Sequence, residues 1–326
     1  MNVLFESIDK LDMECVDRVT EWLSWHLSNF EYVWSWKLWS KQLNEDPSAV
    51  SQVKRNFVTD LLDKCIRLSS YDAIKAAIPK GLHGFLPEQP QDAEGAPSKT
   101  PESEELRRMF VENDTFGINR FISEHKDTPD TVLKALLSLL QEGRVVPFMN
   151  NANLIKNSDE SSIFNEECVL ECLNECNLSL QDLSFAISVL VDAKFASRIA
   201  FVKWVFSDAH AKILCRSAAW DIVRKLLDGM VAAEESEDHG MDVDGSESDV
   251  SAAVLHILRF ILENVNGEVF PDAGSSDGSE KSYFCTTIGE HAIEFVRKYG
   301  KYIGSDASEL VSQLSCIDER LSDYSN

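Results

Sequence analysis

The sequence lacks any uninterrupted run of about eighteen apolar residues, the length at which a membrane-spanning helix becomes a candidate. Its first residues, MNVLFESIDKLD, contain acidic side chains and no apolar core of signal-peptide length. We therefore expect no membrane association. In the absence of an export signal, we expect the 8 cysteines to be reduced thiols of the cytosol or nucleus.

Motifs that carry common enzyme chemistry are also missing. The chain contains neither of the glycine-rich patterns that cradle phosphates, G-x-G-x-x-G and G-x-x-x-x-G-K-[ST]. The metalloprotease pattern H-E-x-x-H is absent as well. We predict that the protein is not an enzyme, has no catalytic residues and uses no cofactor.

Positive charge is scarce relative to negative charge. Lys and Arg total 31 and Asp and Glu total 55, which gives a net charge of −24 at pH 7. A protein that grips a phosphate backbone needs basic residues to displace counterions. We therefore expect any action on nucleic acid to pass through another subunit.

A stripe of three cysteines is the one arrangement that suggests a metal. Cys168, Cys172 and Cys176 are spaced by four, so on a helix they lie along one face. One interpretation is a metal or redox site, and the other is a buried stripe of small side chains. Thiols strung along one helix cannot all reach one tetrahedral ion. We therefore predict no metal site.

The most distinctive stretch present is rich in tryptophan. Five of the 7 tryptophans lie within VDRVTEWLSWHLSNFEYVWSWKLW, residues 16–39. Apolar residues recur there at helical spacing, which predicts one buried stripe. We expect Trp22 and Trp25 to widen this stripe and to pack in the core. The alternative is that Trp34 or Trp36, after the predicted helix, binds a partner protein, because tryptophan is common at interface anchors.

Almost every other segment has helical periodicity, and no strand pair or hairpin turn is apparent. We predict an all-α fold of stacked antiparallel helical hairpins forming one domain over residues 1–326. Long loops are expected at about 79–103, 231–249 and 266–281, where proline, glycine or acidic residues accumulate. The helices are predicted at 3–11, 15–30, 36–43, 53–68, 71–78, 116–125, 129–142, 166–176, 180–193, 195–206, 209–227, 250–265, 283–299 and 305–321.

Several helix ends follow from capping signals. Thr100-Pro101 and Thr128-Pro129 each predict a helix start with threonine as the N-cap and proline in the first turn, and Gly143 predicts the end of the second helix. Ser70 and Ser179 are expected to cap the helices that follow them. The polar segment 150–162 is predicted to be a loop, and Gly229 is predicted to follow the end of the helix at 209–227.

Four collinear blocks of the sequence resemble a known family. The blocks are VDRVTEWLSWHLSNFEYVWSWKLW, VKRNFVTDLLDKCIRLS, FVKWVFSD and AAWDIVRKLL. They resemble the last helical domain of the large subunit of the nuclear cap-binding complex. The resemblance implies a HEAT-like α-solenoid of the type found in the middle domain of the translation initiation scaffold. Because that subunit carries three helical domains, it also implies a piece lacking the two upstream ones.

The resemblance further implies a non-enzymatic scaffold in the nucleus that also shuttles to the cytoplasm. It would support a small subunit with an RNA-recognition fold, which binds the 7-methylguanosine cap, so no residue of this chain would contact the cap. RNA-processing factors of splicing, export, decay and translation would be further partners. Two alternatives stay open: a generic helical-repeat scaffold of translation initiation or RNA decay, and a metal enzyme built on the cysteine stripe.

Overall fold

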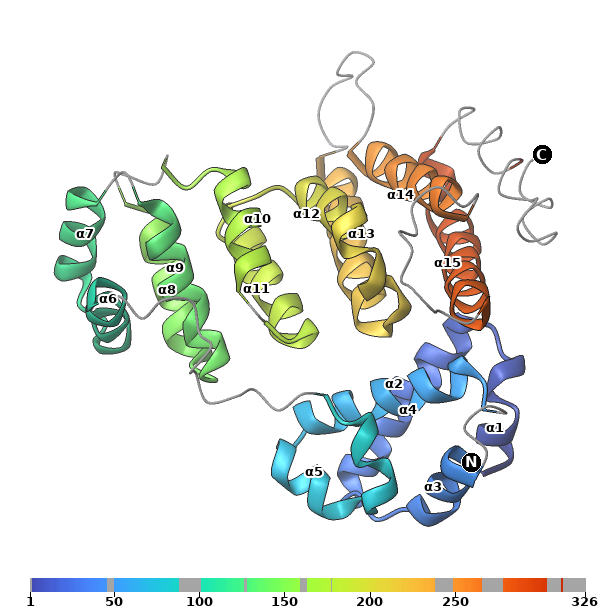
Figure 1. Cartoon of the computed structure of the whole chain (residues 1–326). Coiled ribbons are helices and arrows are strands. Elements are labelled where there is room, and N and C mark those ends of the chain that lie inside the picture. The colour runs from blue at the N-terminus through green and yellow to red at the C-terminus, as the bar shows by residue number, and fades with distance from the viewer. Residues whose placement is uncertain are drawn as a thin grey trace. The chain divides into compact units, whose positions relative to one another are not determined.

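A computed structural model describes the chain at residues 2–45, 50–87, 101–125, 128–158, 163–176, 178–237, 249–265, 278–303 and 312. Within these ranges the regular structure is helical throughout and contains no strand (Figure 1). The predicted all-α fold of stacked helical hairpins is confirmed. The described residues form two compact units, so the single domain over 1–326 stays a prediction.

The first unit is assembled from three separate stretches of chain: Met1–Gln89, Phe206–Trp220 and Glu237–Asn326. Its elements are α1 (Asn2–Glu6), η1 (Ile8–Lys10), α2 (Met13–Asn29), α3 (Trp36–Glu45), α4 (Gln52–Arg67), α5 (Tyr71–Ala77), η2 (Lys80–Phe85), η4 (Asp208–Cys215), α14 (Asp249–Val265), α15 (Gly278–Tyr299) and η5 (Gly300–Tyr302). Within it, α2 packs along α4, and α15 packs on both of these helices. Helices from the two ends of the sequence therefore share one core.

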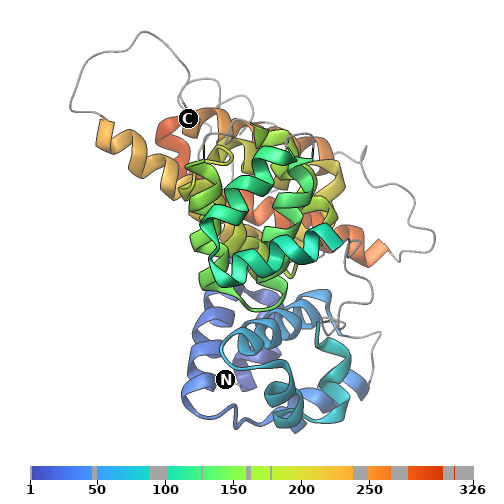
Figure 2. The same ribbon diagram turned by 90° about the vertical axis from the view of Figure 1, so that its left-hand side faces the viewer.

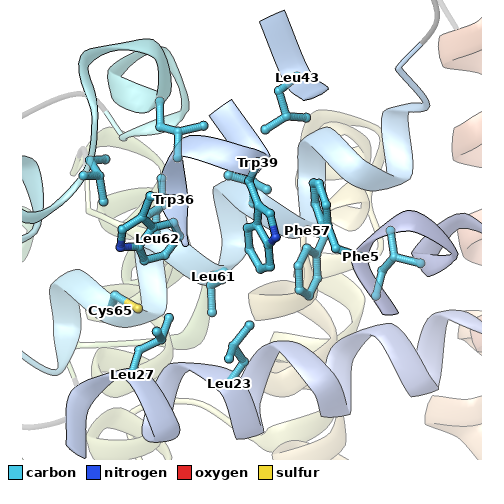
Figure 3. Packing of buried hydrophobic residues seen from close by; sticks show 14 of the residues in the cluster. Phe5, Leu23, Leu27, Trp36, Trp39, Leu43, Phe57, Leu61, Leu62 and Cys65 are labelled. Atoms are coloured by element: carbon cyan, nitrogen blue, oxygen red, sulfur yellow. The ribbon is translucent and has the colours of Figure 1, made fainter. Parts of the chain in front are cut away.

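Aromatic rings build the centre of this core. The ring of Trp39 stacks on that of Phe5, with 4.3 Å between their centroids, and contacts the rings of Trp36 and Phe57. Trp36 and Trp39 are 4% and 1% exposed. Figure 3 shows these rings above Leu23 and Leu27, which point from α2 into the same cluster. Tryptophan does organise the core, but through α3 rather than through α2.

The prediction that Trp22 and Trp25 of α2 pack in the core is wrong. Trp22 and Trp25 are 53% and 54% exposed. The buried stripe of α2 is completed instead by two small side chains, Thr20 and Ser24, each 1% exposed. Their hydroxyls donate hydrogen bonds to the carbonyls of Val16 and Glu21, at 2.8 and 2.7 Å. A helix advances about 100° per residue, so Trp22 and Trp25 fall outside the stripe that contains Leu23.

The exposure of Trp22 gives a first testable prediction. Replacing Trp22 with alanine should change the free energy of unfolding by less than about 1 kcal/mol, because surface substitutions seldom cost more. Urea unfolding followed by circular dichroism measures this change. A loss of about 3 kcal/mol, as expected of a buried ring, would contradict the structure.

The second unit comprises Pro90–Val205 and Asp221–Ser236. Its helices are α6 (Pro101–Glu112), α7 (Thr115–Glu124), α8 (Pro129–Gln141), α9 (Val145–Lys156), α10 (Glu166–Glu175), α11 (Leu180–Asp192), α12 (Arg198–Val205) and most of α13 (Ser217–Glu237). Figure 1 shows them as hairpins following one another in sequence order, and Figure 2 looks along this row. Each hairpin buries its apolar face against its neighbours, as in other helical repeats.

Most of the predicted capping signals are confirmed. Pro129 lies in the first turn of α8, and Gly143, with φ of +70°, follows the end of that helix. The side-chain oxygens of Ser70 and Ser179 accept hydrogen bonds from backbone N–H groups in the first turns of α5 and α11. These local signals act within one turn, so distant residues do not alter them.

Two predicted boundaries are wrong. The segment expected to be a loop at 150–162 contains the second half of α9, where Ala152 and Ile155 are buried against the unit. The single helix expected at 209–227 is divided, because the 3-10 helix η4 ends at Cys215 and α13 begins at Ser217 and continues past Gly229 to Glu237. A Cβ at position 229 would lie 2.7 Å from Nε of Arg198, so glycine serves there to admit this side chain rather than to end the helix.

Three expectations fall mainly outside the described residues. They are the predicted helix at 305–321, of which only residue 312 is described, and the central parts of the loops expected at 79–103 and 266–281. The described ends of the three expected loops are partly helical, because η2 occupies Lys80–Phe85, α13 extends to Glu237 and α15 begins at Gly278. Among the described helices, none is both long enough and apolar enough to cross a bilayer.

Candidate protein-interaction surface

Aromatic rings continue from the core of the first unit to its surface along α2. The edge of Trp34 meets the buried Trp39 ring, and the imidazole of His26 contacts Trp34 at a centroid distance of 6.3 Å. His26 then stacks on Trp22 at 5.3 Å and contacts Phe30 at 4.6 Å. The exposed rings are therefore supported from below by a packed aromatic column.

A tight turn after α2 makes this column possible. Glu31 and Tyr32 both adopt the left-handed conformation, with φ of 54° and 59°. The Tyr32 N–H donates to the carbonyl of Leu27 at 2.8 Å, and the Trp36 indole donates to the carbonyl of Tyr32 at 2.9 Å. Non-glycine residues rarely take this conformation. The turn reverses the chain and brings Trp34 beneath His26.

The two tryptophans proposed as partner-binding residues lie at different depths. Trp36 is 4% exposed and packs in the core, so its ring offers a partner almost no surface. Trp34 is partly buried, and its indole nitrogen is buried without a hydrogen-bond partner. A partner role for Trp34 stays a prediction, and in this chain Trp34 supports the exposed rings from beneath.

The surface that sequence reasoning missed is the exposed face of α2 itself. We call the exposed side chains of Trp22 and Trp25, together with Glu21 beside Trp25, the Trp22–Trp25 surface. The Trp25 indole donates to Oε1 of Glu21 at 2.8 Å, and Nζ of Lys64 lies 2.6 Å from Oε2 of the same carboxylate. A helical projection anchored on Leu23 and Leu27 alone would have indicated that Trp22 and Trp25 lie outside the buried face.

Such a surface can bind but is not equipped for catalysis. Large exposed aromatic side chains on a soluble protein often mark contact sites, because they gain buried area at little entropic cost. The surface presents no activated nucleophile or paired acid and base. Its chemistry is stacking, apolar contact and attraction of positive charge.

The cysteine stripe lies in the second unit on α10 and at its end. Cys172 and Cys176 are buried, and Cys168 is partly exposed. Burial raises the pKa of the Cys176 thiol to about 11 and raises that of Cys172 further. In the part of the chain that the structure describes, no group of three or more His, Cys, Asp or Glu residues has the geometry to hold a metal ion. The stripe packs as small side chains, with the Cys172 thiol 3.8 Å from the carbonyl oxygen of Asp130.

Thiol reactivity should follow this burial. At pH 8 we expect iodoacetamide to modify exposed Cys15 at least about ten times faster than Cys65, Cys172 and Cys176, since the thiolate is the reactive form. Burial raises the pKa of Cys65 to about 12. Mass spectrometry of peptides from the native protein measures the rates, with urea-unfolded protein as control. Equal rates at Cys15 and Cys172 in the native state would contradict the structure.

The first unit also contains a buried polar cluster around Asp60. Asp60 on α4 accepts a hydrogen bond from Nε of Arg216 at 2.5 Å and another from the backbone N–H of Ser217 at 3.2 Å. Burial raises the pKa of the Asp60 carboxyl, and the charge of Arg216 opposes this rise. A cavity with room for about one water molecule lies beside these residues. The cluster ties separate stretches of chain together, which is a structural role.

Histidines do not form a catalytic group in the described structure. His291 is 1% exposed and stacks on Trp220, with Nδ1 3.1 Å from a Glu294 carboxylate oxygen. His210 contacts the hydroxyl of Ser207, which occupies the N-cap position of η4. His26 is half-buried within the aromatic column.

The chain is similar to a family of nuclear proteins. Residues 1–80 match the model of the family described as MIF4G like. Nuclear cap-binding protein subunit 1 of Oryza sativa subsp. japonica is 27% identical over 304 residues, covering 83% of this chain and 34% of that protein. The protein of the same name from Caenorhabditis briggsae is 26% identical over 252 residues, covering 70% of this chain and 30% of that protein.

A shorter and more similar match comes from the human protein of that name. It is 39% identical over 88 residues, covering 27% of this chain and 11% of the human protein. The chain spans about a third of the length of the rice and nematode relatives. The predicted resemblance to the large subunit of the nuclear cap-binding complex is confirmed.

Proposed function

We propose that this chain, a relative of nuclear cap-binding protein subunit 1 over most of its length, is a non-enzymatic scaffold in a nuclear mRNA cap-binding complex. The observation that carries the proposal is the similarity to that subunit over 83% of the chain. The helical fold supports it, because stacked hairpins offer extended surfaces for partner proteins. The net charge of −24 supports an indirect rather than a direct contact with RNA.

In this proposal the chain binds a small subunit with an RNA-recognition fold, and that subunit binds the 7-methylguanosine cap. Holding a flexible partner in its binding-competent form removes part of the entropic cost of cap binding. The complex then links capped RNA to splicing, export, decay and translation factors. It acts in the nucleus and shuttles to the cytoplasm.

The test is reconstitution with the small subunit and a fluorescent capped RNA. Anisotropy measures cap affinity for the small subunit alone, with this chain, and with this chain plus the remaining helical part of a large subunit. We expect the last mixture, at least, to bind capped RNA more tightly and to elute as a larger complex. Unchanged affinity and unchanged size in both mixtures would refute the proposal.

A generic scaffold of translation initiation or RNA decay is the second candidate. It is favoured by the match of residues 1–80 to a family described only as MIF4G like. This candidate predicts that the chain binds a helicase of initiation or decay and not the cap-binding small subunit. A pull-down with both purified proteins as competitors separates the two functions.

A further inference from the structure

The Trp22–Trp25 surface combines exposed aromatic rings with carboxylates. Trp22 and Trp25 are three residues apart on α2, so their Cβ atoms lie about 5–6 Å from each other. Both side chains are more than half exposed, and the Glu21 side chain beside Trp25 is 53% exposed. Indole faces beside a carboxylate attract a cation that is flat enough to stack.

We propose that this surface docks an arginine-bearing basic segment of a partner protein. The guanidinium group stacks on the exposed indole faces and shares the Glu21 carboxylate with Lys64. The proposal concerns a protein contact of this chain and does not depend on its membership of a cap-binding complex.

Charge around the rings complements such a segment. The N-cap of α2, its exposed side and the turn after it carry Asp12, Glu14, Glu21 and Glu31, against two basic residues, Arg18 on α2 and Lys64 on α4 beside Glu21. Arg18 itself pairs with Glu14. The whole chain carries a net charge of −24, so a basic segment is also attracted at longer range.

The rings are held in place before any partner arrives. One face of Trp22 stacks on His26, which rests on the partly buried Trp34. Trp25 is fixed by its hydrogen bond to Glu21, whose other oxygen pairs with Lys64. A partner therefore does not have to order these side chains on binding, which reduces the entropic cost.

Arginine fits this surface better than lysine or RNA does. The guanidinium group is planar, stacks on aromatic faces and bonds a carboxylate through two N–H groups, whereas an ammonium group is a strongly hydrated point charge. Single-stranded RNA also stacks on aromatic rings, but its phosphates need flanking positive charge. Here the flanking charge is mainly negative.

The experiment measures binding of the whole chain to labelled peptides by fluorescence anisotropy. The probes are a glycine–serine peptide carrying four arginines, the same peptide with four lysines, and a single-stranded oligouridine RNA. We expect the arginine peptide to bind at least about fivefold more tightly than the lysine peptide, and no RNA binding. The Trp22→Ala/Trp25→Ala double variant should bind the arginine peptide about tenfold more weakly, from the loss of two cation–π contacts.

Matched variants separate stacking from general attraction. Phe116→Ala removes an 80% exposed ring from the second unit and should leave peptide binding unchanged. Glu21→Gln keeps an acceptor for Trp25 but removes the charge, and should weaken binding about threefold. Circular dichroism confirms that each variant is folded.

Four outcomes would overturn the proposal. They are no binding of the arginine peptide, equal binding of the arginine and lysine peptides, equal losses in the double variant and in Phe116→Ala, and RNA binding that the double variant abolishes. The last would assign the surface to nucleic acid instead.

Discussion

Replacing Trp39 with alanine should lower the free energy of unfolding of the first unit by about 3–5 kcal/mol. Trp39 is 1% exposed and stacks on Phe5, which is 2% exposed. Truncation would leave a cavity that the surrounding rings of Trp36 and Phe57 cannot close without leaving their own packing. It would also remove the hydrogen bond from the Trp39 indole to Oδ1 of Asn2, at 3.3 Å.

Urea unfolding monitored by circular dichroism measures this loss, with Trp22→Ala as the matched control. The two substitutions delete the same side chain from the same unit and differ mainly in burial, at 1% and 53% exposed. We expect their effects to differ by more than about 2 kcal/mol. Similar losses from the two variants would mean that the aromatic core is wrongly placed.

Replacing Arg216 with alanine should cost about 3 kcal/mol at pH 7. Arg216 is the cation that pairs with the buried carboxylate of Asp60, which is 8% exposed. Removing one partner of a buried pair leaves the other as an uncompensated charge, which costs more than the pair itself contributes. Asp63, 3.7 Å from Nη2 of Arg216, would lose the same cation.

This cost should shrink as the pH falls. Burial already raises the pKa of Asp60 above its ordinary value of 3.8, and the Arg216 charge holds the rise back. Without Arg216 the pKa rises further, so Asp60 takes up a proton in the folded state at a pH where the unfolded chain is still ionised. When the pKa of a carboxyl is higher in the folded than in the unfolded state, the free energy of unfolding falls as the pH rises through the folded-state pKa. It recovers as the pH decreases.

Unfolding curves at pH 7 and pH 5 measure the difference between the original chain and Arg216→Ala. Arg120→Ala is the control, because Arg120 makes an exposed pair with Glu124 at 2.8 Å and its removal should have no measurable effect. If the free energy of unfolding lost in Arg216→Ala is larger at pH 5 than at pH 7, the assigned role of Asp60 is contradicted.

Local sequence signals predicted this fold well, and the reason is physical. Capping by Ser70 or Ser179 and the end of α8 at Gly143 depend on side chains within a turn of the boundary. The continuation of α13 through Gly229 could not be foreseen, because the reason for glycine at this position is a close approach of the Arg198 side chain from α12 and not a helix end. Distant packing of this kind overrides local propensity.

The candidate surface was missed because periodicity identifies a buried face only approximately. The sequence indicated that α2 was aromatic and amphipathic, but large rings were assumed to be inside. Thr20 and Ser24 occupy buried positions of α2, which packs along α4. Only the tertiary contacts show that Trp22 and Trp25 remain at the surface.

The discontinuous make-up of the first unit has a consequence for synthesis on the ribosome. Met1–Gln89 leave the exit tunnel before Pro90–Val205, yet α15, which packs on α2 and α4, is synthesised after both of these stretches. The second unit, mostly Pro90–Val205, consists of contacts between near neighbours and can form while translation continues. During synthesis α2 and α4 therefore have one side uncovered until α15 is made. In this interval their uncovered side is accessible to a chaperone.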